Sequence, residues 1–394
     1  MNNEGRLIPP WPVFSSEEVK ASSEVLRSGQ VNYWTGDQGK LFEKEFADNI
    51  GVNHAIALAN GTLALDLALK GLGISSGHEV IVTPRSFIAS VSCVVNAGAT
   101  PVFADIDNVS GNINADTITK VITPKTKAII CVHLAGWPCE MDDIMELASE
   151  HNLFVIEDCA QAHGSTYKGN KVGSIGHVGA WSFCQDKIMS TGGEGGMVTT
   201  NDKSLWKNMW AYKDHGKNYD SINNKELSPG FKWLHDSFGS NFRMTEFQSS
   251  IGRIQLKKLD EWSRIRNKNA KQLKEVCDRY SDMLYTPTCN NYSHHAYYKF
   301  YTYINPSAVG KGWSRDRIIE ELNSEGVPSF SGSCSEIYLE KAFEDVSSKP
   351  KKRLPVAKML GENSLVFLVH PTLSCEDLDF ISSKMDKIFN EAKR

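Results

Sequence analysis

An acidic residue and a lysine each follow a largely apolar segment in the middle of this chain. Asp158 directly follows Leu153–Glu157, and Lys187 comes shortly after Gly179–Phe183. A carboxylate at the end of an apolar strand needs a positively charged partner, and a poorly solvated lysine amine becomes a nucleophile toward aldehydes. The pair therefore suits an aldehyde cofactor with a protonated pyridine ring. Their alternative roles are a solvated lysine and an aspartate that caps a helix or forms a salt bridge.

Other side chains near these segments suit the same kind of cofactor. Gly61 and Thr62 follow a strand-like run, and N–H groups at such a helix start favour a phosphate, although alone this pattern is more often a simple cap. Phe87 offers an aromatic face for stacking, with ordinary core packing as its alternative. Gln161 and His163 are near enough to Asp158 to reach polar atoms of the same ring, or either is a satisfied loop residue.

The glycine-rich segment after the lysine is not a dinucleotide-binding motif. Gly192-Gly193-Glu194-Gly195-Gly196 permits positive φ and close backbone approach, but it lacks the G-x-G-x-x-G spacing. It also precedes a strand instead of opening a helix. An NAD-dependent oxidoreductase is therefore disfavoured.

Length and composition indicate a soluble globular protein with one large and one smaller domain. The chain has 394 residues, 41% hydrophobic and 23% charged, with a net charge of −4, which disfavours nucleic acid and anionic membranes as partners. The 9 cysteines lack CxxC spacing and suit a reduced compartment, so we expect neither a disulfide framework nor a metal site. Without a signal-peptide pattern or a long apolar stretch, the cytoplasm is the expected location.

Strand-like and helical segments alternate along most of the chain. The expected strands are 54–59, 79–83, 101–105, 127–133, 153–157, 179–183 and 196–200. The expected helices are 16–29, 41–50, 62–72, 86–97, 115–121 and 142–151. This alternation predicts an α/β fold with a mostly parallel sheet covered by helices on both faces, and a ligand site at the carboxyl ends of its strands. The last strand follows its predecessor without a helix, so it is expected to be antiparallel.

Three regions are expected along the chain. Residues 1–14 are proline-rich and form an extended arm, which either packs on its own domain or reaches a partner subunit. Residues 15–255 form the large domain, and a long helical pattern through residues 245–280 marks the joint. Residues 256–394 form a smaller α+β domain. Its expected strands are 297–304 and 364–368, and its expected helices are 314–326 and 375–392.

Five motifs in this order resemble those of fold-type I pyridoxal phosphate (PLP) enzymes, specifically the DegT/StrS-type nucleotide-sugar aminotransferases. They are Asn60-Gly61-Thr62-Leu63-Ala64-Leu65, Glu157-Asp158-Cys159-Ala160-Gln161-Ala162-His163-Gly164, Ser182-Phe183-Cys184-Gln185-Asp186-Lys187, Thr191-Gly192-Gly193-Glu194-Gly195-Gly196-Met197, and Asn241-Phe242-Arg243-Met244-Thr245-Glu246 with Gln248. The resemblance runs from Asn32 through Gln255. It implies a seven-stranded, mostly parallel sheet in the large domain.

The resemblance also implies roles for residues at the cofactor ring. Lys187 would bind the cofactor covalently and later move the proton at the substrate carbon. Asp158 would pair with the pyridine nitrogen and maintain the ring as an electron sink. Gln161 would contact the ring hydroxyl, and Phe87 would stack on the ring.

Further residues are implied at the phosphate and the sugar. Gly61, Thr62 and Ser182 would hold the phosphate. The family position of Asn241 reaches the phosphate from the neighbouring subunit, which implies a homodimer with shared active sites. His215 matches a family position near the sugar and completes the expected catalytic set.

The implied reaction is a ping-pong transamination. Glutamate would give its amino group to PLP and leave as 2-oxoglutarate. A nucleotide-linked 4-keto-6-deoxy sugar would then receive the amino group. The whole chain most resembles enzymes that make dTDP-4-amino-4,6-dideoxyglucose for bacterial surface polysaccharide (O-antigen), so dTDP-4-keto-6-deoxyglucose is the expected acceptor.

Several alternatives stay open. A sugar dehydratase of the same fold would carry histidine where Lys187 stands, which favours transamination here. GDP- and UDP-linked keto sugars are other candidate acceptors. Trp137, Cys139 and residues 329–336 depart from the usual family pattern and bear on substrate identity. A non-catalytic PLP-binding regulator would normally need an added DNA-binding module, and the short arm and acidic balance provide none.

Overall fold

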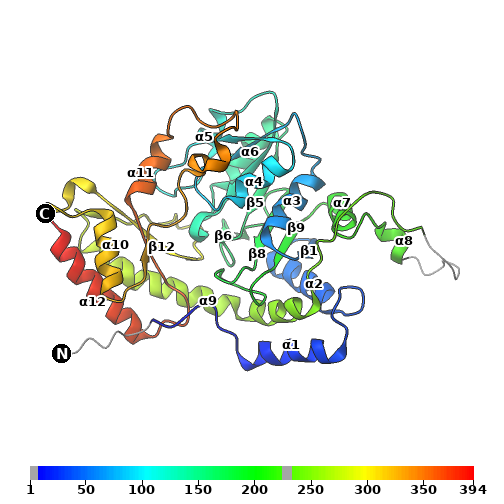
Figure 1. Ribbon diagram of the computed structural model, residues 1–394, viewed down its shortest axis with the longest axis horizontal. Helices are drawn as coiled ribbons and strands as arrows, with labels where there is room; N and C mark the ends of the chain where they lie inside the picture. The colour runs from blue at the N-terminus through cyan, green and yellow to red at the C-terminus, as the bar shows by residue number, and fades with distance from the viewer. Residues whose placement is uncertain (1–7, 224–232) are drawn as a thin grey trace.

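The computed structural model describes residues 8–223 and 233–394, and its largest element is a seven-stranded sheet (Figure 1). The strand order is β1 (His54–Leu58), β9 (Gly196–Thr200), β8 (Val178–Ser182), β5 (Phe154–Asp158), β4 (Thr126–Val132), β2 (Glu79–Val82) and β3 (Thr100–Phe103). Strand β9 is antiparallel to both β1 and β8, whereas the pairs from β8 to β3 are parallel. The predicted mostly parallel sheet, with its antiparallel strand at 196–200, is confirmed.

Helices cover both faces of this sheet, as predicted. They are α2 (Gln38–Ile50), α3 (Gly61–Gly71), α4 (Ala89–Asn96), α5 (Ala115–Thr119), α6 (Met141–Glu150), α7 (Lys203–Lys213) and α9 (Glu246–Asp278). Helix α1 (Ser16–Ser28) packs against α9. Side chains of a strand alternate between faces. Accordingly Ile56 and Leu58 of β1 pack in one core with α3 and α7, whereas Ala55 and Ala57 pack in another with α2 and α9.

The helices differ from expectation in several places: α8 (Tyr219–Asn223) and α11 (Pro355–Asn363) were not predicted, and two further differences have visible causes. Helix α4 starts at Ala89, not at Ser86, since the Ser90 N–H donates to the Phe87 carbonyl oxygen at 3.2 Å and not to that of Ser86. Helix α7 was not predicted. Its start was visible in the sequence, since Asp202 caps it by accepting the N–H groups of Ser204 and Leu205.

The C-terminal part has a sheet and a core of its own. Its four-stranded antiparallel sheet has the order β10 (Leu284–Tyr285), β12 (Phe300–Ile304), β14 (Ser364–Phe367) and β13 (Ser329–Phe330). Helices α10 (Arg315–Ser324), α11 (Pro355–Asn363) and α12 (Cys375–Ala392) accompany it. A third, small sheet joins β11 (Ser293–His294), β6 (Thr166–Tyr167) and β7 (Asn170–Lys171). The predicted α+β character of this part agrees with the structure.

One continuous helix connects the two parts. Helix α9 (Glu246–Asp278) spans the expected joint and extends from α1 and α2 at one end to α12 at the other (Figure 1). The division at 255/256 stays a prediction. None of the described helices has the length and apolar character needed to cross a membrane.

The described part of the N-terminal arm lies on its own chain. The Trp11 indole N–H donates to the Lys187 carbonyl oxygen at 2.7 Å. The same ring meets Trp262 edge-on and stacks on His370. The arm thereby touches the backbone of the predicted catalytic lysine.

A buried acid fixes the end of β5. Glu157 is fully buried, and its Oε2 atom accepts hydrogen bonds from His133 Nε2 at 3.0 Å and Gly173 N–H at 2.8 Å. Its Oε1 atom accepts the N–H groups of Ile175 and Gly176 at 2.8 and 2.6 Å. Burial alone would raise the pKa of Glu157, but the hydrogen bond from His133 and those from the backbone lower it below its usual value.

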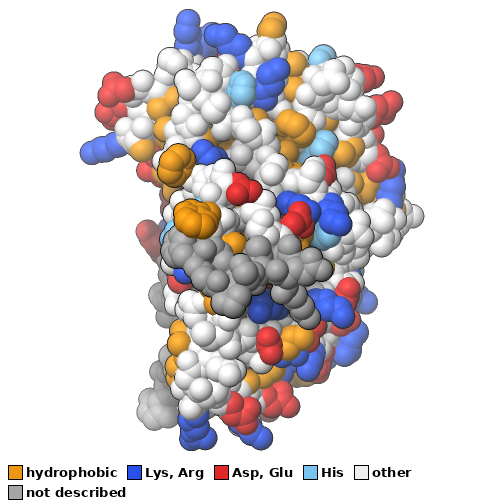
Figure 2. Space-filling view, turned by 90° about the vertical axis from the view of Figure 1, so that its right-hand side faces the viewer, with side chains coloured by type: hydrophobic (Ala, Val, Ile, Leu, Met, Phe, Trp, Pro, Cys, Tyr) orange, Lys and Arg blue, Asp and Glu red, His pale blue; other side chains and the backbone are white. Residues whose placement is uncertain are grey.

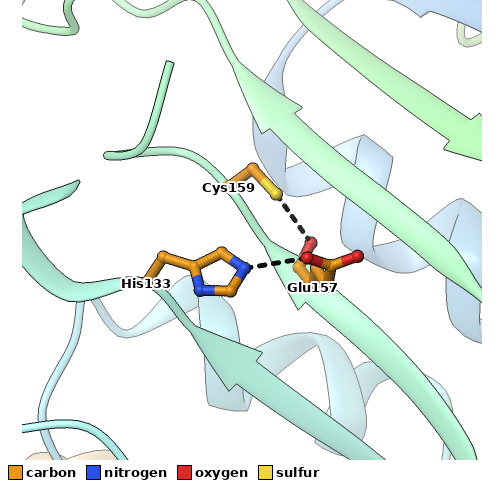
Figure 3. A group of neighbouring side chains, drawn as sticks. All are labelled: His133, Glu157 and Cys159. Carbon is orange, nitrogen blue, oxygen red and sulfur yellow. Dashed lines mark hydrogen bonds and ion pairs between the residues drawn. The ribbon is translucent and has the colours of Figure 1, made fainter. Parts of the chain in front are cut away.

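The same cluster has the residue types of a metal site. His133, Glu157 and Cys159 bring their ligand atoms within 4.8 Å of one another (Figure 3). However, His133 Nδ1 accepts the Cys139 N–H at 3.0 Å, so the imidazole proton is on Nε2 and points at Glu157. Because both ring nitrogens and both carboxylate oxygens already have protein partners, we interpret the cluster as a structural hydrogen-bond network.

The network predicts a stability effect for Glu157→Gln. The new amide would direct N–H hydrogens at backbone donors, so we expect a loss of about 2–4 kcal/mol in the free energy of unfolding by urea at pH 7. The pKa of Glu157 is lowered in the folded state, so its contribution is present above the usual glutamate pKa of about 4.3 and disappears as the pH falls. The difference between the two proteins should therefore shrink in acid. Glu150→Gln, at an exposed position of α6, is the control; equal stabilities of wild type and Glu157→Gln at pH 7 would contradict the interpretation.

Candidate active site

A single cavity of about 920 Å³ collects most of the predicted site residues. It lies at the carboxyl ends of the parallel strands, where β4, β5 and β8 end with Val132, Asp158 and Ser182. The predicted residues that line it are Gly61, Thr62, Phe87, Asp158, Gln161, Ser182 and Lys187. The cavity therefore lies at the edge of the sheet where the sequence predicted a ligand site.

One end of the cavity is formed by the start of α3. Asn60 caps this helix, its Oδ1 atom accepting the Leu63 N–H at 3.0 Å. A Cβ atom on Gly61 would lie 2.5 Å from the Cβ of Ser182, so a glycine is required for this close approach. The helix N-terminus and the hydroxyls of Thr62 and Ser182 consequently meet in the cavity, in an arrangement that suits a phosphate.

Asp158 lies at the end of β5 and is almost completely buried. Its Oδ2 atom accepts the Ser90 hydroxyl hydrogen at 2.7 Å, and Oδ1 accepts the Ala160 N–H at 3.1 Å. Burial raises the pKa of the Asp158 carboxyl, which these hydrogen bonds and the charge of Lys187 lower only in part. A cationic group in the cavity would favour the charged form. Ser90 belongs to no motif, and the sequence analysis missed it.

Lys187 is held beside two residues that the sequence analysis did not select. Its Nζ atom lies 3.7 Å from the Asp186 carboxylate and 5.0 Å from the centre of the Tyr298 ring. The Tyr298 hydroxyl donates to Asp186. Tyr298 lies far along the chain, just before β12, and no spacing pattern links it to the lysine.

Phe87 and Gln161 both present groups to the cavity. Phe87 is 67% exposed, so its alternative role as a core residue is wrong and its ring is available for stacking. Gln161 has its Oε1 atom occupied by the Ala135 N–H at 2.7 Å, which leaves the amide N–H₂ group for a ligand. His163 instead packs against Trp181 and Phe183, outside the lining of the cavity. Burial lowers its pKa to about 3, so the ring is neutral.

His215 and Asn241 lie close to each other but do not line the cavity. Asp214 and Asn241 form an antiparallel bridge, and the His215 N–H donates to the Ser240 carbonyl oxygen at 2.9 Å. Both side chains are exposed. Their predicted roles stay predictions.

The departures from the family pattern lie in two different places. Gly332, Ser333 and Cys334 line the main cavity, as expected for a segment that bears on the substrate. Trp137 lines a separate small pocket, and Cys139 is buried behind His133. The segment 329–336 is therefore the better candidate for substrate selection.

Comparisons with known proteins agree with this geometry. Residues 12–386 match the model of the DegT/DnrJ/EryC1/StrS aminotransferase family. GDP-perosamine synthase of Escherichia coli O157:H7 is 34% identical over 390 residues, which are 96% of this chain and 99% of that protein. UDP-N-acetyl-3-dehydro-alpha-D-glucosamine 3-aminotransferase of Acidithiobacillus ferrooxidans is 35% identical, over 90% of this chain and 89% of that protein.

Solved structures have the same architecture. The X-ray structure of the aminotransferase from Psychrobacter cryohalolentis is 57% identical, with a TM-score of 0.97 over 98% of this chain and 99% of that one. The structure of 3-amino-5-hydroxybenzoic acid synthase is 26% identical, with a TM-score of 0.86 over 98% of this chain and 99% of that one. The chain therefore belongs to the DegT/DnrJ/EryC1/StrS aminotransferase family and is a PLP-dependent nucleotide-sugar aminotransferase of fold type I.

Proposed function

We propose that this enzyme transfers the amino group of glutamate to a 4-keto-6-deoxy sugar linked to a nucleotide, for an amino sugar of bacterial surface polysaccharide. The observation that carries the proposal is that Lys187 and Asp158 line one cavity at the carboxyl ends of the parallel strands. A dehydratase of the same fold is disfavoured because the lysine is retained. The two reactions differ in their products, since only transamination releases 2-oxoglutarate.

The described residues fit PLP in this cavity. Gly61, Thr62 and Ser182 would hold the phosphate at the start of α3, where a Cβ on the glycine would obstruct the approach. Asp158 would pair with the pyridine nitrogen, whose positive charge offsets the cost of burying the carboxylate. Phe87 would stack on the ring, and the Gln161 amide would donate to the ring hydroxyl.

The reaction needs one side chain that moves a proton and other side chains that orient this proton-transfer group. Bound PLP withdraws electrons from the substrate carbon that carries the nitrogen. The Lys187 Nζ atom would remove the proton from the α-carbon of the donor and later deliver a proton to the sugar carbon. Asp186 and Tyr298 would orient this amine, and Trp11 would fix its backbone through the hydrogen bond to the Lys187 carbonyl oxygen.

We further propose that the active site is completed by a second copy of the chain. A nucleotide sugar carries a negatively charged diphosphate, yet Lys187 is the single basic side chain among the described residues that line the cavity, which also include Glu194 and Glu340. Asn241 would reach the phosphate in the site of the partner subunit, and His215 would lie near the sugar. Figure 2 shows the face on the side of α7 and α8 (Tyr219–Asn223), on which hydrophobic side chains are exposed among charged ones.

The nucleotide is the finer part of the proposal. The resemblance of the whole chain favours dTDP-4-keto-6-deoxyglucose as the acceptor. A GDP-linked sugar is the second candidate, because relatives 34% and 36% identical are named GDP-perosamine synthases. A UDP-linked sugar is the third, since a relative 35% identical is named for a UDP-sugar and for amination at carbon 3.

Purified protein given dTDP-, GDP- and UDP-linked 4-keto-6-deoxy sugars with glutamate would identify the acceptor. We expect an amino sugar and an equal amount of 2-oxoglutarate, with the highest kcat/KM for the dTDP-linked sugar. Turnover of the GDP- or UDP-linked sugar alone would reject the dTDP assignment. Consumption of keto sugar without 2-oxoglutarate would reject transamination itself.

Lys187→Ala tests the role of the amine. We expect the variant to stay folded, to lose the visible absorption of covalently bound cofactor and to lose turnover, because no other lysine lines the cavity among the described residues. Absorbance, circular dichroism and product formation are measured together. Lys311→Ala, at an exposed position, is the control, and retained turnover in Lys187→Ala would rule out the mechanism.

Asp158→Ala tests the electron sink. Without a carboxylate at the ring nitrogen, kcat should fall by several powers of ten, at about 1.4 kcal/mol of barrier for each factor of ten. Single-turnover rates of the PLP-loaded protein with glutamate measure this directly. Asp143→Ala, exposed on α6, should react like wild type. A rate within tenfold of wild type for Asp158→Ala would show that the aspartate is not required for the electron sink.

A further inference from the structure

A second cavity lies directly beside the first. Its volume is about 280 Å³, and Asp186 and Tyr298 line both cavities. The remaining walls come from the arm, from helix α9 and from the C-terminal part, with Trp11, Arg266 and His370 among their residues. Because Asp186 lies 3.7 Å from the Lys187 amine, the second cavity begins next to the reacting group.

Two buried side chains in this cavity have polar atoms without a hydrogen-bond partner among the described residues. Arg266 is 1% exposed; its Nη1 atom donates to the carbonyl oxygens of Tyr297 and Tyr298, whereas Nε and Nη2 have no partner. His370 is 3% exposed, and burial lowers its pKa to about 3, so its ring is neutral. Its Nδ1 atom bonds the Thr372 hydroxyl, which itself donates to the Pro10 carbonyl oxygen, and its Nε2 atom has no partner. A buried donor without an acceptor is costly, so the Nε and Nη2 atoms of Arg266 indicate a ligand that accepts hydrogen bonds.

The charges in the cavity indicate that the ligand is an anion. Arg266 and Lys299 both line the cavity, and Asp186 is the one acidic residue among its lining residues. Asp186 is already engaged by the Tyr298 hydroxyl and by Lys187. Burial lowers the pKa of Arg266 to about 9 and that of Lys299 to about 8, although the Asp186 carboxylate offsets part of the effect on Lys299.

The size and place of the cavity narrow the choice of anion. Pockets for drug-sized ligands measure about 300–1,000 Å³, so this cavity suits a small group. The cofactor phosphate is assigned to Gly61 and Ser182, which do not line it. A guanidinium recognises carboxylates in a planar, bidentate geometry. If a ligand carries an amine close to its carboxylate, binding of that carboxylate in this cavity would place the amine near Lys187.

We propose that the cavity formed by Arg266, Lys299 and His370 binds a carboxylate of the amino donor and of the 2-oxo acid product. This inference rests on the proposed transamination from an amino acid, and it adds the residues that recognise the donor. Trp11 closes the cavity, with its ring centre 5.0 Å from the Arg266 guanidinium carbon. The arm would therefore serve donor binding as well as the support of Lys187.

Glutarate, a dicarboxylate without an amino group, tests the site directly because it binds without reacting. Its Kd is measured by calorimetry on the PLP-loaded wild type and on Lys299→Ala, whose half-buried side chain can be removed without opening the core. We expect the Kd to rise about tenfold, the usual size of one charge-assisted hydrogen bond. Lys311→Ala removes an exposed lysine of the same part of the chain and should bind like wild type. An unchanged Kd in Lys299→Ala overturns the proposal.

Two further measurements support or reject the same assignment. Arg266→Lys retains the positive charge but not the planar, forked set of N–H donors, so its Kd for glutarate should also rise at least tenfold while its cofactor content stays unchanged. Glutarate binding by this variant as tight as by wild type would count against the site. In the half-reaction of PLP-loaded Lys299→Ala with glutamate, we expect the apparent Kd for glutamate to rise. The half-reaction of the pyridoxamine-loaded variant with keto sugar should keep the wild-type apparent Kd. An equal rise in the apparent Kd for glutamate and for keto sugar would reject a donor-specific role.

These results are separable from the proposed acceptor. If no nucleotide-linked keto sugar is aminated but glutarate binding still depends on Lys299, the acceptor assignment fails and the carboxylate site stands. If keto sugars are aminated but glutarate binds equally to wild type and Lys299→Ala, the carboxylate site fails and the acceptor assignment stands.

Discussion

The site depends on one carboxylate that the fold removes from water. Asp158 ends a strand in the middle of the seven-stranded sheet, and burial raises its pKa beyond what Ser90, Ala160 and Lys187 offset. Such a group is stable as an anion when a cation is brought to it. In the proposed mechanism a protonated pyridine ring would be that cation, and the same contact would keep the ring able to accept electrons. Binding energy and reactivity would then come from one interaction.

The parallel arrangement of the strands explains why the other cavity residues lie near the Asp158 carboxylate. Parallel strands end at the same edge of a sheet, so the segments after β1, β2, β5 and β8 converge although they are far apart in sequence. Glu157, one residue before Asp158 and on the opposite face of β5, fixes that strand through backbone amides of the following loop. Because side chains alternate between the two faces of β5, Glu157 has a structural role on one face, and Asp158 on the other face is free to serve the proposed cofactor site.

Much of this was predictable from local sequence, because motif residues follow strands whose ends must coincide. The sheet, its antiparallel strand, and the placement of Gly61, Phe87 and Lys187 were anticipated from such patterns. Contacts between segments far apart in the sequence were not predictable in this way. Tyr298 of the C-terminal part and Trp11 of the arm contact the lysine, and Arg266 of α9 lies over Trp11, yet no spacing rule connects these residues. The hydrogen bond from the Ser86 N–H to the distant Cys334 carbonyl oxygen is another contact of this kind.

The state of the ring nitrogen in bound cofactor tests this account most directly. PLP labelled with ¹⁵N in its ring can be bound to the protein and observed by NMR as the pH is raised through neutrality. The account predicts a nitrogen that stays protonated beside the charged Asp158 carboxylate, well above the pH at which free pyridines lose their proton. A ring nitrogen that is unprotonated at neutral pH in the wild-type enzyme would contradict it.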